Sequence, residues 1–270
     1  MLEVPLFDVL YICEIKRKRV DRKIRVGAVS YLNTKPLIYG MEEGMLKEEV
    51  DLLLDTPANI AARLLRNEID CGLVPVATIT ALEEYHIISD YGIAAKGEVA
   101  SVCIFSECRL EEVEEILLDY QSATSVRLVK ILLKEYWKLT PRLVDTRQEF
   151  EHLIKGKTAA DLIGDRALAQ RSTSNYVYDL AEAWVKHTSL PFVFAAWISN
   201  KALSPAFCKA FVAANRYGLE RLDQVIAAHP YPSYDLHHYY TENIHFYIGD
   251  AEKKGLALFL EKLKQYQISF

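Results

Sequence analysis

Polar side chains that could contact a small anion gather at three places in the sequence. The first group is Ser30-Tyr31-Leu32-Asn33-Thr34-Lys35, the second is Gln121-Ser122-Ala123-Thr124-Ser125, and the third is Gly164-Asp165-Arg166. The first two place hydroxyl and amide groups where a helix is expected to begin. Because the N–H groups and the dipole of a helix N-terminus favour negative charge, these positions predict a site for a small carboxylate.

Each group also has a structural interpretation. Serine and threonine at helix starts commonly cap the helix, and for Ser122 or Thr124 taken singly we prefer that interpretation. Asp165 could act as a base, bind a hydroxyl group or cap the helix that follows it, and capping is again preferred. For Asn33, spacing supports a ligand contact and a structural role equally. Arg127 either faces solvent or holds a carboxylate.

The common catalytic and cofactor motifs do not occur in the sequence. It contains no Gly-x-Gly-x-x-Gly, no phosphate-binding loop, no His-Glu-x-x-His and no Gly-x-Ser-x-Gly. His237, His238 and His245 lie in a tyrosine-rich stretch, 231–247, where packing is the preferred interpretation. We therefore predict no metal and no cofactor, and an enzyme built on this chain would work by positioning and polar stabilisation.

Alternating strands and helices must hold these groups in place. The predicted strands are 24–29, 50–54, 70–75, 100–106, 142–145, 159–163 and 192–198, and the predicted helices are 36–41, one from 57, 78–85, 124–137, 205–228 and one from 250. This alternation indicates parallel sheets wrapped by helices, with right-handed crossovers. Ligands of such sheets bind beyond the carboxyl ends of the strands, which is where the three polar groups are expected.

The pattern also predicts how the chain divides. We expect an N-terminal extension at 1–22, one lobe from 23–104 plus 195–270, and a second lobe from 105–194. Two extended segments would cross between the lobes, which could open and close about them. A single-lobe architecture is the alternative.

Composition excludes several classes of protein. The chain has 270 residues, of which 51% are apolar and 26% charged, as in an ordered globular protein. Its net charge of -5 lacks the basic footprint of a nucleic-acid binder, so local groups would have to hold an anion. Five scattered cysteines without a Cys-x-x-Cys motif predict reduced thiols and a cytoplasmic location.

The N-terminus does not have the order of a signal peptide. An apolar run, 4–13, precedes the basic run Lys16-Arg17-Lys18-Arg19, whereas a signal peptide places its charges first. The run is too short to span a bilayer, and no other segment could cross one. Attachment of this extension to a membrane surface is the alternative to a free extension.

Several motifs in a fixed order carry a family resemblance. They are Ile24 to Leu37, Asp55-Thr56-Pro57, Asp70 to Pro75, Gly97 to Val102, Ser125 to Leu128, Leu162 to Leu168, and Leu190 to Trp197. Together they resemble the chorismate dehydratase family, the first enzymes of the futalosine route to menaquinone. The resemblance covers about residues 24–200 well and the C-terminal helices loosely. It implies a two-lobed type II periplasmic-binding-protein-like fold, each lobe a mixed α/β sheet flanked by helices.

The resemblance also implies an activity and its residues. A carbon-oxygen lyase of this family, a hydro-lyase, converts chorismate to 3-[(1-carboxyvinyl)oxy]benzoate and water without a cofactor. Asn33 and Ser101 fall on the family's catalytic positions: Asn33 would orient the enolpyruvyl group or the C4 hydroxyl, and Ser101 would bind a carboxylate or the departing hydroxide. Without the resemblance, Ser101 would be a strand serine satisfied by backbone groups. The residues predicted to bind the substrate are Ser30, Thr124, Ser125, Gly164 and Asp165.

Two other functions stay open. One is a non-catalytic binding protein for a small carboxylate, although such proteins are exported and the N-terminus does not resemble a signal peptide. The other is a later enzyme of the same pathway on the same fold, whose opening motif differs from 30–36. Chorismate is the expected partner, with no nucleic acid and no membrane, and the sequence leaves a homodimer open.

Overall fold

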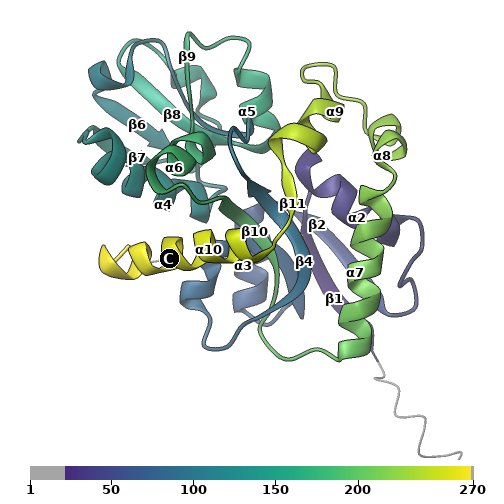
Figure 1. The fold of residues 1–270 in the computed structure, drawn as a ribbon. Coiled ribbons are helices and arrows are strands. Elements are labelled where there is room, and N and C mark those ends of the chain that lie inside the picture. Colours follow the sequence, from purple (N-terminus) through teal and green to yellow (C-terminus); the bar gives the residue numbers. More distant parts are fainter. Residues whose placement is uncertain (1–21, 269–270) are drawn as a thin grey trace, which may run out of the picture.

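Two β-sheets form the framework of the protein (Figure 1). The computed structural model describes residues 22–268. The six-stranded sheet has the strand order β11-β4-β10-β3-β1-β2, and the five-stranded sheet has the order β7-β6-β8-β5-β9. Each sheet contains parallel and antiparallel pairs. The prediction of an α/β fold with two mixed sheets flanked by helices is therefore confirmed.

The strands and helices have the following bounds. The six-stranded sheet contains β1 Ile24–Val29, β2 Val50–Asp55, β3 Cys71–Pro75, β4 His86–Ala95, β10 Phe192–Ser199 and β11 His245–Tyr247, and the five-stranded sheet contains β5 Val102–Ser106, β6 Glu115–Leu118, β7 Arg142–Asp145, β8 Thr158–Ile163 and β9 Tyr176–Asp179. The α-helices are α2 Lys35–Glu42, α3 Pro57–Leu65, α4 Ala123–Leu132, α5 Gly164–Gln170, α6 Leu180–Thr188, α7 Pro205–Leu219, α8 Leu222–Ala228, α9 Leu236–His238 and α10 Asp250–Gln265. Short 3₁₀ or π segments are η1 Leu32–Thr34, η2 Val76–Ala81, η3 Leu110–Glu112, η4 Leu133–Trp137, η5 Glu151–Leu153 and η6 Tyr239–Asn243.

The first strands and helices follow directly from local sequence. β1 pairs in parallel with both β2 and β3, so the carboxyl ends of all three strands lie at one edge of the sheet. Thr56 caps α3, because its hydroxyl accepts from the Asn59 N–H, and Pro57 occupies the first turn. The helix buries Ile60 and Leu64 on the sheet. The turn chemistry thus places α3 with its N-terminus at the carboxyl edge.

Two predicted helices are wrong. Residues 78–85 do not form an α-helix; the chain makes the 3₁₀ segment η2 at Val76–Ala81 and then enters β4 at His86. β-Branched side chains crowd this stretch, and they lose rotamer freedom in an α-helix. The long helix predicted at 205–228 is divided at Glu220 and Arg221 into α7 and α8, and α8 turns to contact α2 and α9.

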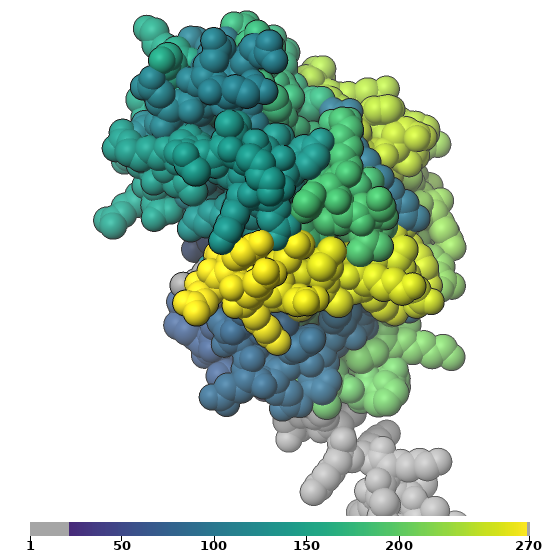
Figure 2. All heavy atoms as spheres, turned by 60° about the vertical axis from the view of Figure 1, so that its left-hand side comes forward, coloured from purple at the N-terminus to yellow at the C-terminus, as the bar shows by residue number. Residues whose placement is uncertain are grey.

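The chain passes between the sheets twice. It leaves β4 for β5 and returns from α6 to β10, so β5 lies wholly in the five-stranded sheet and β10 wholly in the six-stranded one. We propose that the lobe boundaries lie before Val102 and before Phe192, because β5 and β10 begin at these residues. α10 lies across the junction of the two lobes (Figure 2), where Lys262 pairs with Glu135 of η4 at 2.7 Å.

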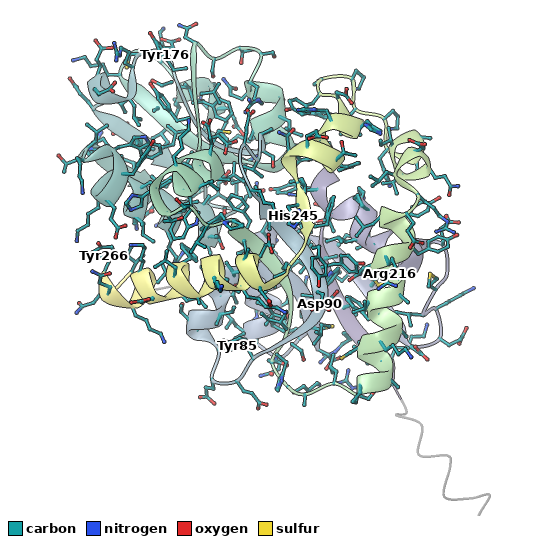
Figure 3. The ribbon with its side chains drawn as sticks, viewed as in Figure 1. Tyr85, Asp90, Tyr176, Arg216, His245 and Tyr266 are labelled. Carbon is teal, nitrogen blue, oxygen red and sulfur yellow. The ribbon has the colours of Figure 1, made fainter. Side chains whose placement is uncertain are left out.

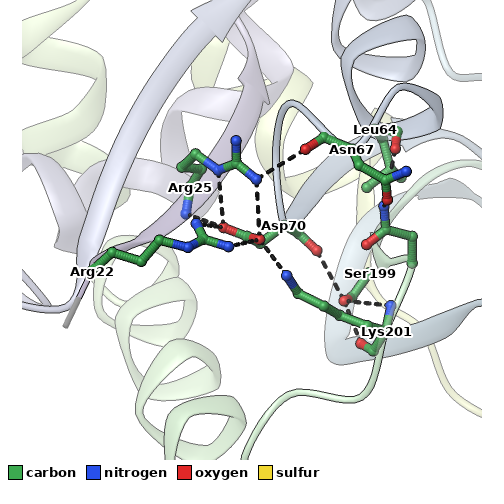
Figure 4. Close-up of polar contacts among 8 residues, drawn as sticks. Arg22, Arg25, Leu64, Asn67, Asp70, Ser199 and Lys201 are labelled. Atoms are coloured by element: carbon green, nitrogen blue, oxygen red, sulfur yellow. Dashed lines mark hydrogen bonds and ion pairs between the residues drawn. The ribbon is translucent and has the colours of Figure 1, made fainter. Parts of the chain in front are cut away.

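An ion cluster lies at the amino ends of β1 and β3 in the six-stranded sheet (Figure 4). The Asp70 side chain, 3% exposed, pairs with Arg22 at 2.8 Å, with Arg25 at 3.2 Å and with Lys201. Burial would raise the pKa of Asp70, but these cations outweigh burial and hold it well below its usual range. Arg22, the last residue of the predicted extension, is therefore bound to the fold.

The remaining expectations about the extension concern residues 1–21, which lie outside the described residues. Within 22–268, no helix is long and apolar enough to cross a membrane. The cysteines in this part of the chain, Cys71, Cys103, Cys108 and Cys208, are all free thiols.

Candidate functional site

A small cavity of about 50 Å³ lies between the two sheets. One wall comes from the six-stranded lobe and the other from the five-stranded lobe. The lining residues are Val29, Tyr31, Asn33, Thr34, Pro57, Leu73, Pro75, Ile93, Val102, Ser122, Thr124, Ile163, Gly164, Phe194 and Ala195. They include the carboxyl ends of β1, β3 and β8 and the N-terminal turns of α3 and α4, as expected for a ligand site in this class of fold.

Asn33 lies on the short 3₁₀ turn η1 between β1 and α2. Long-range bonds fix this turn on both sides: the Leu32 N–H donates to Asp165 Oδ1 at 3.0 Å, and the Tyr240 hydroxyl donates to the Leu32 carbonyl at 2.9 Å. The Thr34 hydroxyl donates to Asn33 Oδ1 at 3.3 Å. The amide of Asn33 is thus held at the cavity with its NH₂ group able to donate to a ligand.

The start of α4 supplies hydroxyl groups from the other lobe. Ser122 caps the helix, because its Oγ accepts from the Ser125 N–H at 3.1 Å, and the capping interpretation is confirmed for this residue. It is wrong for Thr124, whose Oγ1 accepts from the Ala77 N–H across the cleft at 3.2 Å. Ser125 points into the second lobe, where its hydroxyl donates to Asp161 Oδ2 at 2.7 Å.

The backbone of Gly164 lies against the aromatic ring of Tyr31 across the cleft. Gly164 has φ +62°, and a Cβ atom there would lie 2.5 Å from Cδ2 of the Tyr31 ring. The Tyr31 hydroxyl donates to Oε1 of Gln121 in the second lobe. Burial raises the pKa of Tyr31, so the phenol stays protonated and acts as a donor. Glycine is required here both for the backbone conformation and for the close approach.

Asp165 does not cap its own helix, so that interpretation is wrong. The residue that precedes α5 is Ile163, which has no capping side chain, and the Asp165 carboxylate instead accepts from Leu32 in the other lobe. Burial raises the pKa of Asp165. This carboxyl therefore links the lobes beside the cavity.

Ser101 lies one residue before the cavity wall and is completely buried. The Asp179 carboxylate accepts from the Val99 and Ala100 N–H groups at 3.0 and 2.8 Å, and Ala100 adopts φ +64°. The Ser101 carbonyl accepts from the Gly164 N–H at 2.8 Å. The crossing segment is thus clamped on both sides of Ser101, yet the Ser101 hydroxyl has no hydrogen-bond partner among the described residues.

The predicted site residues fall into two groups. Asn33, Thr124 and Gly164 line the cavity. Asp165 does not line it, but it follows Gly164 and accepts from the N–H of Leu32, the residue before Asn33. The cavity lining does not include Ser30, Ser101 or Ser125; Ser30 is exposed, with its N–H bonded to the Asp55 carbonyl. Sequence reasoning did not select Tyr31 or Thr34, although both lie within the polar group that begins at Ser30.

The cavity contains no strong base. Among its lining residues in the described chain there is no Asp, Glu, His, Lys or Arg. No group of three His, Cys, Asp or Glu side chains in residues 22–268 is arranged to hold a metal ion. His245, labelled in Figure 3, instead lies 3.4 Å from Glu252 of α10. The site can therefore bind and orient a ligand by hydroxyl, amide and N–H groups.

A buried acid lies behind this wall, at Asp161 on β8. Burial raises the pKa of Asp161 to about 8, and the nearby negative charge of Asp119 adds to this effect. Asp119 is itself paired with Arg166 at 2.6 Å. Asp161 therefore keeps its proton to a higher pH in the folded protein than in the unfolded chain.

We expect Asp161→Asn to change how stability depends on pH. The folded state keeps a proton that the unfolded chain releases above about pH 4, so wild-type stability falls as pH rises from there towards 8, by up to about 1.4 kcal/mol per pH unit. The variant lacks this component, so its unfolding free energy should decline less over that range. Urea unfolding at pH 5, 6, 7 and 8 measures the difference, and equal slopes for the two proteins would contradict the assignment.

Comparison with known proteins gives matches to one family model and to curated enzymes of one activity. A family model described as menaquinone biosynthesis matches residues 24–265. A chorismate dehydratase of Thermus thermophilus is 30% identical, with 88% of this chain and 94% of that protein covered, and one of Campylobacter jejuni is 25% identical, with 90% and 99% covered. These matches confirm the resemblance drawn from the motifs.

Solved structures agree on the fold. A protein of Archaeoglobus fulgidus superposes with a TM-score of 0.73 at 15% identity, covering 93% of this chain and all of that chain. The periplasmic aliphatic sulphonate binding protein of Escherichia coli gives a TM-score of 0.61 at 12% identity, with 92% and 88% covered. The periplasmic-binding-protein-like fold is thereby confirmed.

Proposed function

The chain belongs to the menaquinone biosynthesis family, and from that premise we propose that it is a chorismate dehydratase, a hydro-lyase that forms 3-[(1-carboxyvinyl)oxy]benzoate and water. The observation that carries the proposal is the match to chorismate dehydratases over nearly the whole chain. The cavity between the lobes, lined by donors from both, is the site we assign to the substrate.

The reaction suits a cavity without an ionised base. Chorismate loses the proton on ring carbon C3 and hydroxide from C4, and the ring becomes aromatic, which supplies the driving force. The ring carboxylate acidifies the C3 proton through the diene, so donors around that carboxylate would stabilise the charge that builds there. The enolpyruvyl carboxylate of the substrate lies near C3 and could accept the proton. The protein would then contribute orientation and hydrogen bonds.

The substrate requires a more open cleft than the one seen here. A cavity of about 50 Å³ is far below the roughly 300 Å³ typical of a small-molecule site. Three links across the cleft hold it closed: Tyr31 to Gln121, Leu32 to Asp165 at 3.0 Å, and Ala77 to Thr124 at 3.2 Å. We infer that these links break or lengthen to admit chorismate and re-form around it.

Incubating the purified protein with chorismate tests the function directly. We expect the ultraviolet absorption of the diene to disappear while an aromatic enol ether accumulates, identified by its mass and proton spectrum. Chorismate that binds but returns intact would favour a binding protein for small carboxylates. Conversion of a later pathway intermediate, with chorismate untouched, would favour another enzyme on this fold.

Asn33→Ala is expected to lower turnover of chorismate at least about tenfold, or 1.4 kcal/mol of barrier. The side chain lies in the cavity wall, and its amide would orient the enolpyruvyl group or the C4 hydroxyl. Steady-state kinetics measure the effect. Asn59→Ala is a control, since Asn59 is exposed and its amide bonds to Asp55 outside the cavity. Turnover of Asn33→Ala equal to wild type would remove Asn33 from the mechanism.

A further inference from the structure

The links that hold the cleft closed all end on acceptors of the second lobe. These acceptors are the side-chain oxygens of Gln121, Thr124 and Asp165, and each receives a bond from the first lobe. Gln121 and Thr124 belong to the start of α4, whereas Asp165 belongs to the first turn of α5. The three links can form together only if the second lobe fixes these two helix starts relative to one another.

Asp119, the residue after β6, bonds to both places. Its side chain has 0% exposure; its Oδ1 accepts from the Gln121 N–H at 2.9 Å, and its Oδ2 accepts from the Ile163 N–H at 3.1 Å. The Asp119 carbonyl accepts from the Ser122 N–H at 3.2 Å. One residue thus ties the start of α4 to the end of β8, and both Ser122 and Ile163 line the cavity.

Arg166, on the first turn of α5, bonds to the same carboxylate. Its Nη2 donates to the two oxygens of Asp119 at 2.8 and 2.6 Å, and its Nη1 donates to Oε1 of Glu151 at 2.9 Å. Because Ile163 also bonds to Asp119, the segment 164–165 between Ile163 and Arg166 is held at both ends. This segment contains the glycine that contacts Tyr31 and the aspartate that accepts from the first lobe.

Only a carboxylate can make this set of bonds. Each oxygen of Asp119 accepts one backbone N–H and one guanidinium N–H, so the acceptor capacity of the group is fully used. Asparagine has the same shape but replaces one oxygen by an NH₂ group, which is a donor. In either orientation this donor would face a backbone N–H, and Gln121 or Ile163 would lose its buried acceptor.

Stability alone does not account for the ion pair between Asp119 and Arg166. Apolar side chains of similar volume often stabilise a core as well as a buried ion pair does. The Asp119 side chain does not line the cavity, but it bonds to Ile163, which does, and to Gln121, which precedes Ser122 of the wall. Asp119 can therefore act on a ligand only through the groups that it holds in place.

We propose that Asp119, together with Arg166, is a positioning residue that sets the three acceptors of the second lobe for closure of the cleft on the substrate. Without its bonds the lobe still folds, but the starts of α4 and α5 no longer meet the donors of the first lobe in one arrangement. Neither residue touches the substrate or exchanges a proton with it. The inference rests on the proposed dehydratase function.

Asp119→Asn tests this role in steady-state kinetics with chorismate, with the folded fraction measured by circular dichroism in the same buffer. We expect kcat to fall about tenfold or more while KM changes less than about threefold, because displaced acceptors weaken the closed state in which the substrate reacts. Arg166→Lys is a second variant. It keeps the charge but replaces the fork by a single nitrogen, so it cannot retain both ion pairs, and its kcat should fall about threefold or more.

Asp70→Asn is the matched control. It also exchanges a buried, ion-paired aspartate for asparagine, with 3% exposure of the Asp70 side chain, but it lies at the opposite end of β3 from the cavity. This variant should lose stability and retain the wild-type kcat. A purely structural role for Asp119 would make the two variants alike in kcat.

Tyr31→Phe supplies a second readout, because it removes the link to Gln121. Asp119 acts partly through that link, so the loss of kcat in Tyr31→Phe with Asp119→Asn should be smaller than the product of the two single losses. Tyr31→Phe with Asp70→Asn should show only the loss of Tyr31→Phe.

Two outcomes overturn different parts of the inference. Wild-type protein that converts chorismate would leave the function standing. In that case, a kcat within about twofold of wild type in folded Asp119→Asn or Arg166→Lys, or losses that multiply fully in Tyr31→Phe with Asp119→Asn, would overturn the positioning role alone. Wild-type protein that does not convert chorismate would overturn the dehydratase function, and the positioning role with it.

Discussion

Gly164→Ala is expected to lower turnover of chorismate about a hundredfold, because it would push apart the two walls of the cavity. The new Cβ would lie 2.5 Å from the ring of Tyr31, which belongs to the opposite lobe. Relief of that contact requires a shift of about 1 Å, and misplacement of this size can cost about 10²-fold in rate. The left-handed backbone at φ +62° adds a folding cost of about 1–2 kcal/mol.

Gly156→Ala separates the two contributions. Gly156 has φ +60°, almost the same as Gly164, but a Cβ there would meet nothing within 4 Å. Gly156→Ala should therefore lose about 1–2 kcal/mol of stability, the same backbone cost as at Gly164, and it should keep wild-type turnover. Steady-state kinetics and urea unfolding of both variants measure the two quantities. Equal turnover in Gly164→Ala and Gly156→Ala would show that the contact with Tyr31 does not govern the site.

Asp70→Asn is expected to reduce the free energy of unfolding by about 3 kcal/mol, the lower end of the range for breaking a buried ion pair. The lower end applies because Arg22, Arg25 and Lys201 keep 40–54% of their side-chain surface in contact with solvent. Catalysis should be unaffected below the unfolding temperature. Asp70 precedes β3, and the cavity lies at the opposite end of that strand, at Pro75.

The stability difference should depend on pH in a defined direction. The pKa of Asp70 is depressed in the folded protein, so its stabilisation is complete above about pH 4, the value of a free aspartate, and is lost as pH falls further. Wild type and Asp70→Asn should therefore converge in strongly acidic solution. Glu68→Gln serves as the control: the pair between Glu68 and Arg66 is exposed, and such pairs contribute about 1 kcal/mol or less. A loss no larger in Asp70→Asn than in Glu68→Gln would contradict the role of the cluster.

Local sequence determined much of the fold. The strand at 24–29, the Thr56-Pro57 start of α3 and the Ser122 cap of α4 depend on residues within a few positions of one another, so their patterns predicted them correctly. The same holds for three residues of the cavity wall: Asn33, Thr124 and Gly164 lie where a strand ends or a helix begins. Strand ends gather at one edge of a sheet, so local chemistry was sufficient to bring them together.

Tertiary structure decided the partners of those residues. Thr124 and Asp165 were interpreted as caps because the nearest donors along the chain are those of their own helices, but both accept from N–H groups of the other lobe. Tyr240 reaches Leu32 across 208 positions of sequence. No periodicity or spacing records such a contact, because it depends on how two lobes and a returning C-terminal segment pack. The polar groups of the sequence therefore identified residues on both walls of the site, and only the folded chain showed which bonds join those walls.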